Sequence, residues 1–245
     1  MKKIFIILIL LPLISFSQNA IIKNLYPVNK HQGSNDSIKA ICYPIIYSST
    51  GIPYTRVNNK IKAYFFNTKD YDTSKPAAKL LQKLYKKDPS LKIDYKISHN
   101  RNGLLSLIIT IISINGDKKP PLYLNYDFIK GDFFTLKDLL NTKNDSVSMR
   151  QAIVPQMADS IRLIEEKLDK NNPNYSDIIE QLNSEIGTFS HAYPVSFVLA
   201  DTEMVFYLDC FLPSGLFNYT HTYKVKFPFK TLKNVLKKAI VTRLQ

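Results

Sequence analysis

Short blocks of apolar residues recur along this chain with two spacings, one typical of strands and the other of helices. The blocks 91–98 and 104–114 are strand-like, and the turn residues of 99–103 lie between them. The second block is apolar enough to be buried on both faces, so we expect it at the centre of a β-sheet. Another strand is predicted at 122–128, where large apolar residues recur at every second position.

Other segments of the first half carry helix and edge-strand signals. Residues 40–47 are strand-like, but Pro44 has no backbone N–H, so this strand is expected at an edge or end of the sheet. Residues 57–65 have apolar side chains at i, i+4, i+7 and i+8, which predicts a helix. Ser74 followed by Pro76 predicts the capped start of the next helix.

The second half of the chain adds helices and a second group of strands. Thr135 is placed to cap a short helix over 136–140, and Pro155 either kinks a longer helix over 145–171 or marks its start. The remaining predicted elements are a helix at 176–186, strands at 195–199, 204–211 and 222–227, and a final helix that includes 232–240. Because strands and helices cluster rather than alternate, the predicted class is α+β, a mainly antiparallel sheet with helices packed on it.

The first seventeen residues match a secretory signal peptide. The cationic Lys2 and Lys3 precede thirteen mostly apolar residues, and small residues occupy the positions before a cleavage site after Ser17. The run is shorter than the roughly 20 apolar residues that span a bilayer, and Gln18, not a lipid-accepting cysteine, follows the cut. We therefore expect a soluble protein that is exported to the periplasm or the extracellular medium.

Three regions are expected in the chain. Residues 1–17 are the signal peptide, and 18–38 are mostly polar without a clear pattern, which predicts a flexible lead-in. The folded α+β domain is expected over 39–245, in lobes of roughly 39–115 and 116–245. No segment after the signal is long and apolar enough to span a membrane.

The net charge of the chain indicates which kinds of partner it is suited to bind. It has 33 Lys and Arg against 20 Asp and Glu, and removal of Lys2 and Lys3 leaves 31 basic residues and a net charge of +11. A field of this sign favours anionic partners such as wall polymers, lipid head groups or acidic proteins, although lysines spread along a chain also serve simply to solvate exposed faces. Nucleic acid is not expected, because an exported chain seldom meets it.

Cys42 and Cys210 are the only cysteines. Export makes a disulfide between them chemically feasible, and in the chain-entropy model a loop of this length is worth roughly 4 to 5 kcal/mol. Two free thiols, each a small hydrophobic side chain in a strand, are an equally simple account. Their pairing therefore stays open at this point.

One stretch combines a strand, a turn and a short helix in a recognisable order. It reads Asn125-Tyr-Asp127, then Lys130-Gly131, then Leu136-Lys-Asp138-Leu139. This order resembles the RsiV-type extracytoplasmic domain, a domain of unknown function whose pattern is N-x-D, a Lys/Thr-Gly turn and Leu-x-Asp-Leu. The closing hairpin, strand and helix over 197–232, and the strand and helix around 43–61, are similar to other parts of that family, so the resemblance covers about 40–240.

The resemblance implies a role in binding or support. Members of the family form the outer part of lysozyme-sensing anti-sigma factors, stand beside polysaccharide deacetylase domains, or occur alone in exported proteins, and no catalytic residues are attributed to the module. The family's Gly-Gly-Ala-His segment is replaced here by 116–121, so no role of that histidine is expected. Since only three residues precede the apolar run, a direct anti-sigma function is not expected either.

No pattern in the chain identifies a catalytic centre. None of the four histidines has metal-ligand spacing, and His99 is expected in a turn. Acidic residues such as Asp127, Asp132 and Asp138 are expected to serve turns and solvation rather than glycoside cleavage. The lysines of the final helix suit either a membrane interface or a helix packed on a sheet, and we favour packing. We therefore expect no catalytic residue, no metal and no cofactor.

Two loops, 118–121 and 212–220, are the expected ligand contacts, where aromatic side chains would stack on a sugar or a partner surface. The candidate binding residues are Lys118, Lys119, Phe217, Asn218, Tyr219 and His221. The leading hypothesis is an exported, non-catalytic binding module of the cell envelope, with a wall glycan or an envelope or host protein such as lysozyme as ligand. The alternatives are a structural or accessory envelope protein that supports a partner domain and, third, a wall-glycan hydrolase or deacetylase.

Overall fold

The computed structural model describes the chain in two compact units, which divide between Phe133 and Phe134. The described residues are 19–25, 42–66, 74–88, 91–112, 118–141, 168–191, 196–210 and 221–244, together with single positions between 149 and 166. The predicted signal peptide therefore lies outside the described residues, as does most of the predicted helix over 145–171. All strand pairs among these residues are antiparallel, and helices accompany them, so the α+β class is confirmed.

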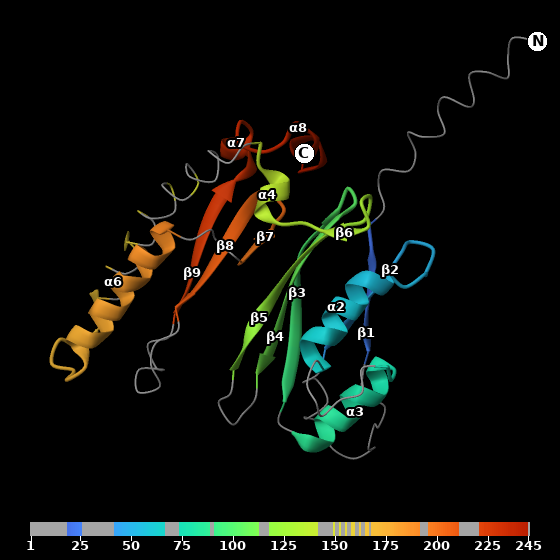
Figure 1. The fold of residues 1–245 in the computed structure, drawn as a ribbon, viewed down its shortest axis with the longest axis horizontal. Helices are drawn as coiled ribbons and strands as arrows, with labels where there is room; N and C mark the ends of the chain where they lie inside the picture. The colour runs from blue at the N-terminus through green and yellow to red at the C-terminus, as the bar shows by residue number, and fades with distance from the viewer. Residues whose placement is uncertain are drawn as a thin grey trace, which may run out of the picture. The chain divides into compact units, whose positions relative to one another are not determined.

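Within the described residues, the strands form three sheets and not the single expected sheet. In the first unit, β1 (Ile21–Leu25) pairs with β2 (Tyr43–Tyr47), and a four-stranded sheet has the order β3 (Lys92–Arg101), β4 (Leu104–Ile112), β5 (Lys118–Asp127) and β6 (Asp132–Phe133). The second unit holds β7 (Ser196–Leu199), β8 (Glu203–Cys210) and β9 (His221–Pro228). Figure 1 shows β3, β4 and β5 as long neighbouring strands.

The beginning of the predicted lead-in is wrong, because residues 21–25 form strand β1. This strand is short and its apolar residues do not alternate with polar ones, so its pattern alone does not show it, and its partner β2 begins only after residue 42. The side-chain amide of Asn100 also binds Ala20, the residue directly before β1. The Ala20 N–H donates to Asn100 Oδ1 at 2.9 Å, and Asn100 Nδ2 donates to Ala20 O at 2.8 Å. The rest of the predicted lead-in lies outside the described residues.

The hairpin of β3 and β4 confirms the predicted pair of strands but tightens the turn. Asn102 and Gly103 both have positive φ, at 53° and 74°, as a two-residue hairpin loop requires. His99, expected in the turn, instead lies in β3 and is 1% exposed. The register shifts between Ile97 and His99. Such a bulge places one extra residue in β3 relative to β4. The pairing of the two strands therefore continues to Arg101 and Leu104, past the start of the turn that the sequence suggested.

Strand β5 also begins earlier than predicted. Lys118 and Lys119 pair with Ile112 and Ile111, so they belong to a strand and not to the expected loop. The two prolines that follow lie where the register shifts, opposite the single residue Thr110. A strand tolerates proline at such an irregularity, because the missing N–H removes no regular ladder hydrogen bond. This pairing also explains why the units divide after β6 and not near residue 115, since β5 stays with β4.

Helices α2 (Thr55–Phe66) and α3 (Ala77–Lys87) share one hydrophobic core with the four-stranded sheet. Val57, Ile61 and Phe65 of α2 are buried, as the helical spacing predicted. The start of α3 differs from the prediction: Pro76 itself is the N-cap residue, and its side chain makes no capping hydrogen bond. From Leu104 to Leu107, strand β4 is buried on both faces.

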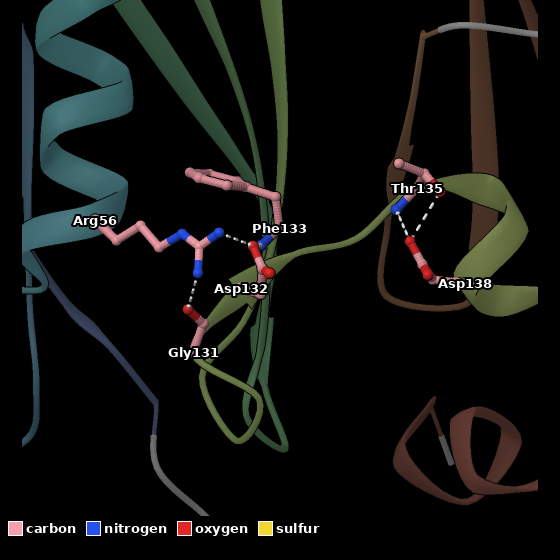
Figure 2. Close-up of polar contacts among 6 residues, drawn as sticks. All are labelled: Arg56, Gly131, Asp132, Phe133, Thr135 and Asp138. Carbon is pink, nitrogen blue, oxygen red and sulfur yellow. Dashed lines mark hydrogen bonds and ion pairs between the residues drawn. The ribbon is translucent and has the colours of Figure 1, made fainter.

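The second unit contains the short helix α4 (Leu136–Leu139), the long helix α6 (Tyr175–His191), the sheet of β7 to β9, and two terminal helices. Thr135 occupies the N-cap of α4 as predicted, and Asp138 Oδ2 accepts hydrogen bonds from both its N–H and its Oγ1, at 2.7 and 2.8 Å (Figure 2). Strands β7, β8 and β9 match their predicted positions to within about two residues.

The predicted final helix is broken into α7 (Phe229–Leu232) and α8 (Lys238–Leu244). Between them, a turn over 233–235 and a single β-bridge of Leu236 with Leu140 lie beside the end of α4. Here the Asn141 N–H donates to Val235 O at 2.9 Å and the Lys237 N–H donates to Leu139 O at 2.8 Å. These hydrogen bonds replace helical ones, which is why the helix stops. Leu232, Leu236 and Ile240 of the segment are still buried, whereas Ala239 is exposed.

Candidate binding face

The β5–β6 turn is built by the polar residues that carry the family resemblance. Asp127 is buried, and its Oδ1 accepts hydrogen bonds from the N–H groups of Ile129 and Lys130, at 2.9 and 3.2 Å. Asn125, also buried, accepts a hydrogen bond from the Ser106 hydroxyl. Gly131 then adopts φ +66°, which favours glycine. Asp127 and Gly131 therefore shape the turn, in agreement with the expectation of turn chemistry for Asp127, whereas Asn125 links β5 to β4.

Arg56, near the start of α2, contacts the β5–β6 turn through its guanidinium group. One guanidinium nitrogen lies 2.8 Å from Asp132 Oδ1, and another donates to the Gly131 carbonyl at 3.4 Å (Figure 2). The two charged side chains are 59% and 50% exposed. An exposed pair of this kind adds about 0 to 1 kcal/mol to the free energy of unfolding. Its clearer effect is to fix where a planar cation and a carboxylate are presented to solvent.

Aromatic rings continue this contact between α2 and the turn. The Tyr54 and Phe128 ring centroids are 4.4 Å apart, and Tyr126 packs edge-on against both Phe128 and Phe133, at 5.3 and 5.1 Å. Burial raises the pKa of Tyr54 and of Tyr126, and in Tyr126 the nearby Arg56 opposes this effect. Both hydroxyls therefore stay protonated at neutral pH. Tyr54 and Phe128 are only half-buried, so parts of both residues contact solvent.

Two isoleucines project from the turns that these contacts hold together. Ile52 is 66% exposed and Ile129 is 57% exposed. Ile52 closes a tight turn with Ser48: its N–H donates to the Ser48 hydroxyl at 3.0 Å, and its carbonyl accepts the Ser48 N–H at 2.8 Å. A contiguous apolar surface beside a polar rim is typical of interaction sites. We call Ile52, Tyr54, Arg56, Phe128, Ile129 and Asp132 the paired-turn face.

Sequence reasoning did not find the paired-turn face. It noted Asp132 only as a turn residue, and Ile52 and Arg56 gave no signal, because an isolated isoleucine in a turn is common. Their importance follows from the packing of Tyr54 on Phe128, which brings two turns from distant parts of the chain together. Tyr54 follows the turn that contains Gly51, and an aromatic residue after such a turn is too common to predict a contact with Phe128.

The predicted site residues are dispersed along the chain. Lys118 and Lys119 start β5 in the first unit, whereas His221 starts β9 in the second, where its backbone pairs with Cys210. The side chains of these residues lie outside the described part of the structure. Phe217, Asn218 and Tyr219 lie entirely outside the described residues. The predicted binding role of all six stays a prediction.

Other chemistry in the described residues is limited. His99 is buried in β3. Among the described residues, no group of three or more His, Cys, Asp or Glu is arranged to hold a metal ion, and no helix is long and apolar enough to cross a membrane. Cys42 is half-buried with a free thiol, and burial and then the charge of Asp94 raise its pKa. Because the Cys210 side chain is not described, the disulfide stays a prediction.

Comparisons with known proteins identify the fold. No protein-family model and no curated protein matches the chain. It is similar in structure to a solved member of the DUF3298 family from Bacteroides fragilis, with a TM-score of 0.51 and 15% sequence identity, over 93% of this chain and 96% of the other. The likeness is one of fold. At this identity the DUF3298 structure supports an α+β domain of that architecture and gives no information on ligand or activity.

Proposed function

We propose that this chain is an exported, non-catalytic binding protein of the cell envelope, and that the paired-turn face contacts its ligand. The exposure of Ile52 and Ile129 on two connected turns carries the proposal. The signal-peptide pattern and the RsiV-type resemblance support export and a binding role. The candidate residues Lys118, Lys119, Phe217, Asn218, Tyr219 and His221 belong to the same proposal as further contacts.

The side chains of the face favour a protein ligand, from the envelope or the host, over a wall glycan. Branched aliphatic side chains offer a sugar neither a flat ring for stacking nor a hydrogen-bond partner, whereas burial of each against a protein is worth about 1.5 to 3 kcal/mol. Arginine is enriched among the residues that dominate binding energy at protein interfaces, and Arg56 is held in position by Asp132. Because hydrogen bonds already close both turns, binding would cost little further conformational entropy.

The test compares two double variants of the mature chain in retention assays against lysozyme, purified envelope proteins and peptidoglycan. Ile52→Ser/Ile129→Ser removes the apolar side chains of the face. Ile21→Ser/Ile97→Ser is the matched control, because those two isoleucines are exposed on strands β1 and β3, at 40% and 42%. We expect retention on one protein ligand to fall more than tenfold in the first variant, since burial of each side chain contributes over about 1.4 kcal/mol, and to persist in the second.

Two results would contradict the proposal. Equal losses in both double variants would show that the isoleucines act through stability and not through contact. Retention on peptidoglycan alone, insensitive to Ile52→Ser/Ile129→Ser, would assign the ligand to a different surface. Export is checked separately by cell fractionation, where an uncleaved chain in the cytosol would overturn that part of the proposal.

A further inference from the structure

The positive charge of the mature chain is concentrated in the first of the two units. Over residues 18–133 the sequence has 18 Lys and Arg against 8 Asp and Glu, a net charge of +10. Over 134–245 it has 13 against 12, a net charge of +1. Ion pairs inside the first unit leave this balance unchanged, because each pair uses one charge of either sign. The unit that contains the paired-turn face therefore attracts anions from a distance.

Two of the three exposed charges at the paired-turn face are positive. Arg56 lies at the start of α2, and Lys130 and Asp132 lie in the β5–β6 turn. A further acidic residue of this turn, Asp127, is 1% exposed, and its carboxylate is used by backbone N–H groups of the turn. Within the part of the chain that the structure describes, the Lys130 ammonium has no ion-pair partner. A ligand of this face therefore meets a surplus positive charge.

The guanidinium of Arg56 keeps hydrogen-bond donors for a ligand. An arginine has five N–H groups, and the contacts with Asp132 Oδ1 and the Gly131 carbonyl engage two of those of Arg56. Asp132 Oδ1 also accepts a hydrogen bond from the Phe133 N–H at 2.7 Å, so the backbone of β6 fixes the carboxylate that positions Arg56 (Figure 2). Since the Arg56 side chain is 59% exposed, a second carboxylate can bind it without displacing Asp132.

We propose that the ligand of the paired-turn face is an acidic segment of a protein, in which a carboxylate side chain lies beside apolar ones. This inference rests on the proposed function and specifies its ligand. Arg56 and Lys130 bind the carboxylate through charge-assisted hydrogen bonds, while Ile52 and Ile129 are buried against its apolar neighbours. A strongly basic protein, including a second copy of this chain, is disfavoured as the ligand, because like charges would face each other.

The test selects ligands from random peptides displayed on phage, with the mature chain as target. Phage that bind the variant Ile52→Ser/Ile129→Ser are removed first. This variant has the net charge of the wild type, so the step discards peptides that are attracted by charge alone. We expect the remaining peptides to contain Asp or Glu next to aliphatic or aromatic residues. The affinity of one such peptide is then measured by isothermal titration calorimetry.

Two charge variants are compared in the calorimetric measurement. Lys130→Glu reverses the surplus charge at the face, and Lys96→Glu, at an exposed position of β3, gives the same net charge. We expect affinity for the peptide to fall about tenfold in Lys130→Glu, because a like charge then faces the carboxylate. In Lys96→Glu it should change less than about twofold at physiological ionic strength, where salt screens distant charges. Circular dichroism verifies that both variants are folded.

The possible failures of this inference and of the proposed function give different results. Equal losses of affinity in Lys130→Glu and Lys96→Glu would show that net charge, and not the face, attracts the peptide. Selected peptides without acidic residues would overturn the acidic ligand but leave the paired-turn face as a binding surface. If no peptide distinguished the wild type from Ile52→Ser/Ile129→Ser, the face itself would be overturned, and this inference with it.

Discussion

The side-chain amide of Asn100 forms two hydrogen bonds with the backbone of Ala20, eighty residues earlier in the chain. It satisfies both backbone groups of Ala20 as a neighbouring strand would. Because Ala20 directly precedes β1, this contact anchors the start of that strand to the end of β3. At the other end of β3, the Cys42 N–H donates to Ile93 O at 2.8 Å, so the two-stranded sheet is tied to the β3 edge at two points.

Replacement of Asn100 by alanine should loosen β1. The buried Ala20 N–H and carbonyl would lose their partners, which costs about 1 to 3 kcal/mol in the free energy of unfolding. Urea denaturation measures the loss, and hydrogen exchange should show faster exchange of the 21–25 amides. Asn59→Ala, at an exposed position of α2, is the control and should change stability by less than about 0.5 kcal/mol. Unchanged protection of β1 in Asn100→Ala would show that its pairing with β2 is sufficient.

The start of α4 provides a second test. Asp138→Ala removes the carboxylate that accepts two hydrogen bonds from Thr135, and we expect a loss of about 1 kcal/mol in the free energy of unfolding. Asp138→Asn keeps an acceptor oxygen and should recover about half of this loss. Lys137→Ala, on the same short helix, is the control. If Asp138→Ala and Lys137→Ala were equally mild, the carboxylate would have no capping role.

Alkaline pH should destabilise the first unit through its buried tyrosines. Burial raises the pKa of Tyr43 above its ordinary value of 10.0 and that of Tyr64 to about 12. A raised pKa means that the folded state keeps its proton longer, so this stability is complete below pH 10.0 and is lost as the unfolded chain ionises above it. For Tyr64 the loss runs from the ordinary value to about pH 12, and for Tyr43 it continues beyond that.

The alkaline effect is checked by urea denaturation of wild type and Tyr43→Phe between neutral pH and the tyrosine range. The variant has no phenol to ionise at position 43, so its stability should fall less steeply above pH 10.0. At neutral pH the two curves should show the same slope of stability against pH, which is the internal control. An identical alkaline slope would mean that another group causes the loss.

The Cys42 thiol should react slowly. Burial, and then the negative charge of Asp94, raise its pKa, and only the thiolate is nucleophilic. Asp94→Asn should therefore speed alkylation at pH 7 about twofold, whereas Lys96→Gln, which removes an exposed cation of the same strand, should not. Mass spectrometry of the Cys42 peptide follows the reaction. An unchanged rate in Asp94→Asn would contradict the assigned electrostatic cause.

The predicted disulfide has its own assay. A thiol count on the denatured, unreduced exported protein gives two free thiols if Cys42 and Cys210 are separate and none if they pair.

The elements that were predicted well have local causes. The α2 helix follows from the spacing of Val57, Ile61 and Phe65, and the β3–β4 hairpin follows from two apolar blocks around Asn102-Gly103. These signals involve residues a few positions apart, which interact before any distant contact forms. For the same reason the capping of α4 by Thr135 and Asp138 could be read from their spacing of three residues.

The errors arose where distant segments decide the outcome. The short strand β1 exists because β2 and Asn100 provide partners for it. The final helix breaks because Leu139 and Asn141 take over backbone groups of the segment between α7 and α8. In both cases a hydrogen bond from far along the chain overrides the local preference, and a local pattern contains no information about such a partner.

By itself, the sequence determined the α+β class, the positions of most helices and strands, and the excess of positive charge, because these depend on composition and on short-range spacing. Tertiary structure alone decided that Tyr54 packs on Phe128 and Arg56 pairs with Asp132, and so where Ile52 and Ile129 are exposed. A surface is made of residues whose exposure depends on what packs beneath them. That packing joins parts of the chain that no local pattern connects.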